Sequence, residues 1–189
     1  IELDLFRTAD GKLVVIHDDT TGRVADENRS VTKSTYRQLQ SLDVASKFRS
    51  DRGLTIEQYP RQAIPTLEDV LRLVMSQDRT RVSIQPKMDC VRESIELIRS
   101  MRAERWVGFN DGRLDFMAKA KRLAPEIPVF WDRGPDLKVS DDLETAAEHG
   151  FESLVLHHSA INEDNVRQIK AAGFEVGVWT VNDPSRMRT

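Results

Sequence analysis

The chain has 189 residues, which suffices for one well-buried core and is short for two, so we expect a single domain over residues 1–189. Its net charge of −3 is spread over interspersed acids and bases, which argues against a nucleic-acid partner. The single cysteine excludes an internal disulfide and a thiolate metal cage, and no apolar run reaches the ~20 residues of a membrane span. The sequence shows no targeting segment and opens within a strand pattern at Ile1, so we expect a fragment. Compartment and oligomeric state stay open.

The first elements form a predicted β-hairpin. An apolar strand over residues 1–5 and a second over residues 13–18 flank Asp10-Gly11, a dipeptide typical of two-residue hairpin loops. A two-residue loop pairs Ala9 with Lys12 across the hairpin.

Counting outward from that loop places His17 directly opposite Asp4, at about 5 Å between Cβ atoms. Glu2 shares the face of Asp4 because the side chains of a strand alternate. The neighbouring positions are apolar, so we expect these ionisable groups to have a function or a partner. The alternative is a surface hairpin whose polar side chains face water.

Residues 19–63 are polar and are interpreted as an insertion, with one short helix around residues 35–42 that Ser34 caps. Thr66 then caps a helix with acids in its first turn. Beyond it, strands and helices alternate. The predicted strands cover residues 81–87, 106–109, 128–131, 153–157 and 175–181, and the helices cover residues 91–101, 114–123, 143–149 and 163–172. Gly150 and Gly173 stand where helices end.

Repeated strand–helix units predict parallel strands with right-handed crossovers. The first strand and the five later ones give six parallel strands, which predicts an α/β fold of the TIM (β/α)8 barrel type, incomplete in this chain and lacking its first and last strands. The alternative is an open doubly wound sheet, which normally has a glycine-rich first turn that this sequence lacks.

Polar and aromatic side chains gather where these strands end, the face on which barrels carry their active sites. Glu2-x-Asp4 and Gln85-x-Lys87 each place two side chains on one face, so three oxygen ligands and an ammonium converge. Hard oxygen ligands suit Mg²⁺ or Ca²⁺. The other strand ends carry Asn110, Trp131, Asp132, His157 or His158, Trp179 and Asn182.

A divalent cation beside a lysine and a histidine is a chemically sensible phosphoester site, because both cations offset negative charge on phosphate oxygens while the imidazole moves a proton. The alternatives are a solvated strand end for Gln85 and Lys87, and a core position for Trp179. The His157-His158 pair is read as incidental, since adjacent strand residues point to opposite faces.

Four motifs make the chain resemble the glycerophosphodiester phosphodiesterases, whose barrel is akin to that of phosphatidylinositol-specific phospholipases C. They are Glu2-x-Asp4, then Thr8-x-Asp10-Gly11-x-Leu13-Val14-Val15-x-His17-Asp18, then Ile64-Pro65-Thr66-Leu67-Glu68-Asp69-Val70-Leu71, and Gly177-Val178-Trp179-Thr180-Val181-Asn182. The resemblance runs over essentially the whole chain. Residues 19–63 are similar to the family's small insertion, which the related sphingomyelinase D-type enzymes lack.

The resemblance implies site roles. His17 is implied as an acid/base residue, Glu2 and Asp4 as metal ligands, Lys87 as a phosphate contact and Trp179 as a wall of the glycerol pocket. It also implies that a neighbouring glycerol hydroxyl can act as the first nucleophile on the phosphodiester. The partner is thus a small-molecule phosphodiester, and the cofactor a divalent metal, Mg²⁺ or Ca²⁺.

Two features depart from the family pattern. The His-Arg-Gly strand that supplies a second catalytic histidine is not in this chain, and Gln85 stands where the family usually has a glutamate. Glutamine still offers a carbonyl oxygen to a metal, with one negative charge fewer. The leading hypothesis is metal-dependent hydrolysis of glycerophosphodiesters to glycerol 3-phosphate and an alcohol. The alternatives are a catalytically weak or silent phosphodiester-binding barrel and a lysophospholipase D-like enzyme.

Overall fold

The computed structural model describes residues 1–188 of the chain. Residue contacts group the chain into two compact units, one from Ile1 to Trp106 and one from Val107 onward. Strands and helices alternate along most of the chain, which confirms the predicted α/β class. Among the described residues, no helix is both long and apolar enough to cross a membrane.

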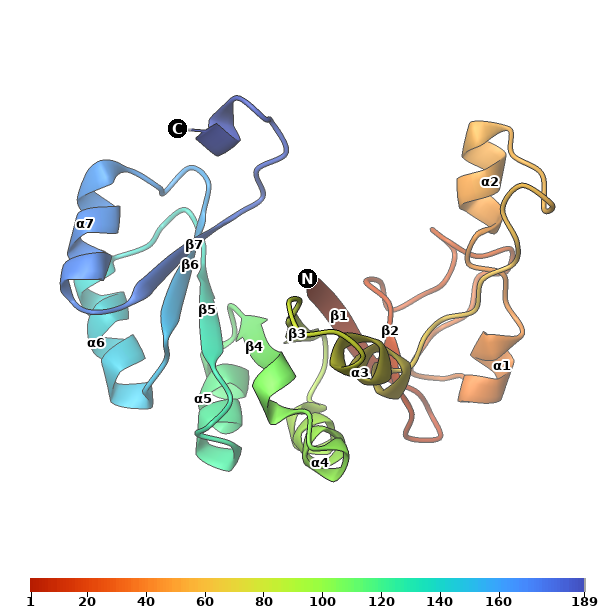
Figure 1. Ribbon diagram of the computed structural model, residues 1–189, viewed down its shortest axis with the longest axis horizontal. Coiled ribbons are helices and arrows are strands. Elements are labelled where there is room, and N and C mark those ends of the chain that lie inside the picture. Colours follow the sequence, from red (N-terminus) through yellow and green to blue (C-terminus); the bar gives the residue numbers. More distant parts are fainter. Residues whose placement is uncertain (189) are drawn as a thin grey trace. The chain divides into compact units, whose positions relative to one another are not determined.

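The first unit contains three hydrogen-bonded strands in the order β2-β1-β3 (Figure 1). The central strand β1 (Glu2–Arg7) runs antiparallel to β2 (Leu13–Val15) and parallel to β3 (Val82–Pro86). Helix α3 packs against both β2 and α4. The remaining elements of this unit are α1 (Tyr36–Gln40), α2 (Ser46–Arg52), α3 (Leu67–Met75), α4 (Val91–Met101) and the 3-10 turn η1 (Glu104–Trp106).

The second unit is a run of parallel strands in the order β4-β5-β6-β7, each followed by a helix or turn that leads to the next element (Figure 1). Helix α5 packs on β4 and β5, α7 packs on β7, and α6 lies beside α7. The elements are β4 (Val107–Asp111), α5 (Leu114–Leu123), β5 (Val129–Arg133), α6 (Val139–His149), β6 (Ser153–His157), α7 (Glu163–Ala171), β7 (Glu175–Trp179) and η2 (Arg186–Arg188).

Most predicted elements are confirmed to within a few residues, and α4, α5 and β6 have the predicted bounds. Helix α6 begins at Val139, four residues before the predicted start, because its polar first turn hides the apolar period while Asp141 and Asp142 favour a helix N-terminus. Helix α1 is capped by Thr35 instead of Ser34, since Thr35 forms a capping box with Gln38. Helix α2, which is short and polar, was not predicted.

The hairpin loop is longer than predicted. Arg7 pairs with Leu13, and within the loop the amide of Thr8 donates to the carbonyl of Lys12 at 2.8 Å. The amide of Gly11 donates to the carbonyl of Thr8 at 3.0 Å, and Gly11 has a φ of 84°. This is a three-residue loop, a tight turn followed by a left-handed glycine. Asp10 stabilises it by accepting hydrogen bonds from the Thr8 hydroxyl at 2.6 Å and from the Tyr36 amide at 2.9 Å.

The extra loop residue shifts the register by one. Ile16, not His17, lies across from Asp4, and its amide donates to the Asp4 carbonyl at 3.1 Å. The predicted opposition of His17 and Asp4 is therefore wrong. Strand β2 ends at Val15, so the direction of the His17 side chain is set by the turn that follows and not by strand alternation.

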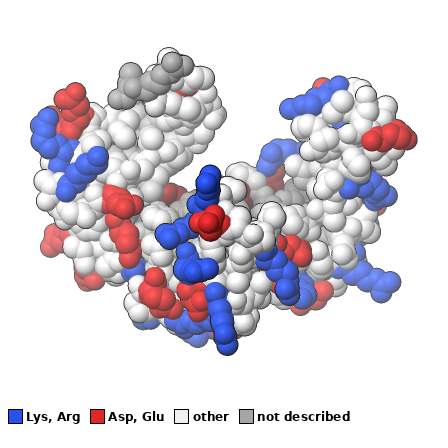
Figure 2. All heavy atoms as spheres, viewed as in Figure 1, with Lys and Arg blue, Asp and Glu red and all other residues white. Residues whose placement is uncertain are grey.

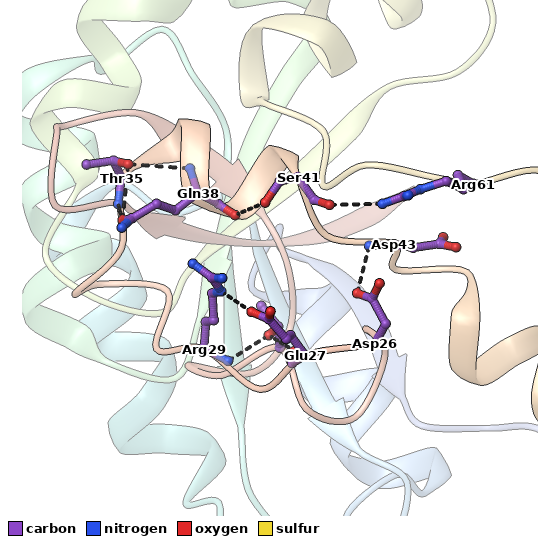
Figure 3. A network of polar contacts seen from close by, with 9 residues as sticks. Asp26, Glu27, Arg29, Thr35, Gln38, Ser41, Asp43 and Arg61 are labelled. Carbon is purple, nitrogen blue, oxygen red and sulfur yellow. Dashed lines mark hydrogen bonds and ion pairs between the residues drawn. The ribbon is translucent and has the colours of Figure 1, made fainter.

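Residues 19–63 are packed onto the hairpin through a small hydrophobic cluster. Phe6 and Val14 of the hairpin contribute to it, and the segment supplies Ala25, Val31, Leu39 and Leu42. Hydrogen bonds also connect residues within the segment. The Asp43 amide donates to Asp26 at 3.0 Å, and Arg61 donates to the Ser41 carbonyl at 2.9 Å (Figure 3). The segment is thus an ordered part of the first unit.

Charges of both signs are interspersed on the face of the molecule shown in Figure 2, as the sequence suggests. Acidic and basic side chains form pairs such as Arg72 with Glu68 and Lys121 with Glu152.

Replacement of Gly11 by alanine tests the loop. An added Cβ would meet nothing within 4 Å, so the cost comes from the positive φ alone, and we expect a loss of about 1 kcal/mol in the free energy of unfolding. Urea unfolding measures it. Gly134→Ala is the matched control, because its Cβ also meets nothing and its φ is not positive. Equal stability of the two variants would contradict the three-residue loop.

Replacement of Thr66 by alanine tests the cap of α3. The Thr66 hydroxyl accepts from the Asp69 amide at 3.1 Å, and we expect its loss to cost about 1 kcal/mol of unfolding free energy. The Thr66 amide and hydroxyl in turn donate to the Asp69 carboxylate and lower its pKa, so this second contribution is present at neutral pH and is lost as the pH falls through the lowered pKa. Urea unfolding at pH 7 and at pH 3.5 measures both effects. Thr145→Ala, on α6, should show neither.

Candidate active site

The parallel pair β1 and β3 presents a polar face at one side of the first unit. Asp4 pairs in register with Gln85, and Glu2 pairs with Ser83. The alternate residues Leu3, Leu5 and Ile84 are buried, so the polar side chains point the other way. The predicted convergence of Glu2-x-Asp4 with Gln85-x-Lys87 on one face is thus found in the structure.

Lys87 joins this face at its centre. Its ammonium lies 2.8 Å from Asp4 Oδ1 and also donates to Gln85 Oε1. The Lys87 and Asp4 side chains are only 23% and 15% exposed, so their attraction is screened less than that of a surface pair. The ammonium is therefore held in place by oxygens from both strands.

His17 contacts a carboxylate other than the predicted one. Its Nδ1 lies 2.6 Å from Asp18 Oδ1, and the other oxygen of Asp18 accepts from Arg23 Nε at 2.5 Å. These two contacts lower the pKa of Asp18 to about 2, with the Arg23 hydrogen bond as the larger cause. Asp18 is therefore ionised at neutral pH and can only accept, so the Nδ1 of His17 carries the shared hydrogen.

The charge of Asp4 on the strand face also acts on Arg23. The pKa of its guanidinium is raised, chiefly by Asp18, and Coulombic attraction from Asp4 adds to the increase. Arg23 thus lies within the electrostatic field of Asp4. Sequence spacing predicts His17 opposite Asp4 because it assumes a two-residue loop. In the structure His17 contacts Asp18, and Asp18 also contacts Arg23.

Two residues of this group escaped the sequence reasoning. Asp18 follows His17 directly and belongs to the second motif of the family resemblance, so its place in the sequence marks it. Arg23 lies within residues 19–63, where polar residues are common, so nothing in the spacing marked it.

In the second unit, Trp179 and His157 are register partners at the ends of β7 and β6. Their rings meet edge-to-face at 4.9 Å between centroids, and the His157 and His158 rings are 4.2 Å apart. Trp179 is 39% exposed on β7, the outermost strand of the sheet. Asn110 donates to Asp132 at 3.2 Å on neighbouring strands, so these strand-end residues also gather.

One feature of the β1–β3 face favours a divalent cation and another competes with it. Two carboxylates and an amide oxygen on one face are the hard donors that Mg²⁺ and Ca²⁺ prefer. The Lys87 ammonium contacts two of those three side chains, so a cation would share them with Lys87. Among residues 1–188, no three His, Cys, Asp or Glu side chains are grouped so as to hold a metal. The donor types fit a hard cation, but a set of three donors requires the Gln85 oxygen and competes with Lys87 for Asp4 and Gln85.

Several curated relatives of this chain are named glycerophosphodiester phosphodiesterases. One from Bacillus subtilis (strain 168) is 25% identical over 211 residues, covering 99% of this chain and 68% of its own length. Another, from Caldanaerobacter subterraneus subsp. tengcongensis, is 30% identical over 135 residues, covering 68% of this chain and 52% of its own length.

Solved structures show the same fold. A glycerophosphodiester phosphodiesterase from Parabacteroides distasonis aligns with a TM-score of 0.77 at 24% identity, over 99% of this chain and 73% of its own. An Oleispira antarctica phosphodiesterase, solved in complex with the product sn-glycerol-3-phosphate, aligns with a TM-score of 0.80 at 24% identity, over 97% and 73%. The predicted TIM-barrel type of α/β fold is confirmed. The model of the glycerophosphoryl diester phosphodiesterase family matches residues 1–189, and the chain therefore belongs to this family of enzymes.

Proposed function

We propose that the protein hydrolyses glycerophosphodiesters to glycerol 3-phosphate and an alcohol. The observation that carries the proposal is the Lys87 ammonium held between Asp4 and Gln85, on the same face as Glu2. A fixed cation among oxygens suits a phosphodiester, because negative charge builds up on its oxygens during cleavage. Family membership and the product bound by the Oleispira relative support the same reaction.

His17 is proposed as an acid/base residue. Because its Nδ1 is hydrogen-bonded to Asp18, the Nε2 atom is the one that exchanges a proton with the reacting group. The side chain is 61% exposed, so substrate can reach it. Lys87 contacts the phosphate in this proposal. The glycerol-pocket role of Trp179, in the second unit, is proposed from the family resemblance.

A divalent cation, Mg²⁺ or Ca²⁺, is proposed as the cofactor. Glu2, Asp4 and Gln85 would hold it, and its charge would offset that of the phosphate oxygens. Since Gln85 is neutral, the site has one negative charge fewer than a three-carboxylate site, and we expect weak binding.

Gln85 also favours a second candidate function, a phosphodiester-binding barrel with weak or no turnover. Release of glycerol 3-phosphate from glycerophosphocholine by the complete protein, with and without added Mg²⁺ or Ca²⁺, separates the two. Faster turnover of a long-chain lysophospholipid would instead favour the lysophospholipase D-like alternative. Bound but uncleaved glycerophosphocholine at every metal concentration would contradict the enzymatic proposal.

Replacement of His17 by alanine tests its role. Loss of an acid/base group should lower kcat by about 10²–10⁴-fold, because proton transfer then falls to water. Steady-state kinetics on glycerophosphocholine measures the change. His149→Ala, at the end of α6 in the second unit, is the control and should leave kcat unaltered. An unchanged kcat in His17→Ala would remove His17 from the mechanism.

Replacement of Gln85 by glutamate tests the metal site. The added carboxylate should tighten binding of Mg²⁺ or Ca²⁺ and shift activation to lower metal concentration, because ligand charge sets much of the affinity for hard cations. Calorimetric titration of both proteins measures binding independently of turnover. Gln168→Glu, at an exposed position of α7 in the second unit, controls for the change in net charge. Equal affinities of Gln85→Glu and the parent protein would place Gln85 outside the metal site.

A further inference from the structure

Asp18 holds His17 and Arg23 at the same time, one on each carboxylate oxygen. The contacts are 2.6 Å to His17 Nδ1 and 2.5 Å from Arg23 Nε. A carboxylate with only one partner can rotate about its terminal bond, whereas one anchored at both oxygens has a fixed plane. The position of Arg23 therefore fixes the direction in which Asp18 meets the imidazole.

The backbone that carries Arg23 is itself fixed. The Thr21 side chain is buried, donates to the Glu27 carbonyl at 2.6 Å and accepts from the Arg29 amide at 2.9 Å. The amides of Val24 and Ala25 donate to the Thr21 carbonyl at 3.1 and 2.8 Å, which closes a turn around Arg23. Ala25 is buried in the cluster that joins this segment to the hairpin. Arg23 thus projects from a rigid turn.

Stability alone does not account for this pair. The Arg23 side chain is 61% exposed and that of Asp18 is 29% exposed, and ion pairs in such surroundings add little to folding. The same pair is well suited to orienting an imidazole, because partners behind a functional histidine set its tautomer and ring direction.

We propose that Arg23 is a positioning residue, which acts through Asp18 to hold His17 with a hydrogen on Nδ1 and with Nε2 directed to the reacting group. The inference rests on the proposed acid/base role of His17. It assigns part of residues 19–63 to the active site and defines a chain of contacts from Arg23 through Asp18 to His17. Arg23 itself does not touch the reacting atoms.

The segment supplies its own matched control. Arg29 lies in the same loop, and its Nε donates to the Glu27 carboxylate as that of Arg23 donates to Asp18 (Figure 3). Arg29→Gln therefore removes the same charge and the same kind of contact from a carboxylate that does not meet His17. Arg23→Lys keeps the charge of Arg23 and loses its planar, directed donor.

Kinetics on glycerophosphocholine gives the first readout. We expect Arg23→Gln to lower kcat ~10-fold or more with KM nearly unchanged, Arg23→Lys to recover part of the loss, and Arg29→Gln to match the parent protein. In a His17→Ala background, Arg23→Gln should have no further effect, because the residue it positions is gone. An equal loss in both backgrounds, or in Arg29→Gln, would overturn the proposal.

Nitrogen NMR of the imidazoles in the folded protein gives a second readout that needs no turnover. His17 in the parent protein should show its hydrogen on Nδ1, and Arg23→Gln should shift His17 toward a mixture of tautomers while the other histidines stay unchanged. An unaltered His17 tautomer in Arg23→Gln would refute the positioning role. If the tautomer shifts as expected but the parent protein does not hydrolyse glycerophosphodiesters, the proposed function fails and the Arg23–Asp18–His17 linkage stands.

Discussion

The parallel pairing of β1 with β3 is the constraint on which the candidate site depends. Its register places Asp4 beside Gln85, and the burial of Leu3, Leu5 and Ile84 decides which face the polar side chains take. A shift of one residue in the strand register would bury the carboxylates and expose the leucines, which would strongly destabilise the fold. The hydrophobic pattern of two short strands thus determines where the ionisable groups meet.

The hairpin and the segment after it complete the site by a different means. The three-residue loop ends β2 at Val15 and releases His17 from strand geometry, so the position of His17 comes from hydrogen bonds. Those hydrogen bonds lead to Arg23, whose turn is anchored by the buried Thr21 and by the cluster around Val14 and Ala25. Residues 19–63 therefore act as a support for the site, and a description of them as an insertion understates their role.

The period of the apolar residues is enough to predict those helices and strands that have one consistently apolar face. The helices α4 and α5 and the strand β6 have the predicted bounds, because their apolar residues recur at the period of the element. Pairing of β1 with β3 followed from the fold class, so the Glu2, Asp4, Gln85 and Lys87 face was predictable too.

The parts that were not predictable depend on side-chain hydrogen bonds between distant residues. Asp10 accepts from the amide of Tyr36, 26 residues away, and this long-range contact helps to select the longer loop over the two-residue loop. Arg23 reaches Asp18 only because the chain folds back between Thr20 and Ser30. Spacing cannot reveal such contacts, because they depend on how loops pack and not on the period of an element.

Gln85 gives the site a particular balance of charge. Glu2, Asp4 and Lys87 together give the face a formal charge of −1, whereas a glutamate at position 85 would make it −2. A face with less negative charge repels an anionic phosphodiester less, and it also attracts a divalent cation less. The neutral Gln85 amide still accepts a hydrogen bond from the Lys87 ammonium and so keeps it in place. Unlike a third carboxylate, the amide does not neutralise the positive charge of Lys87. If the proposed cation binds at this face, the neutral Gln85 would therefore leave Lys87 a larger share of the electrostatic stabilisation of the phosphate.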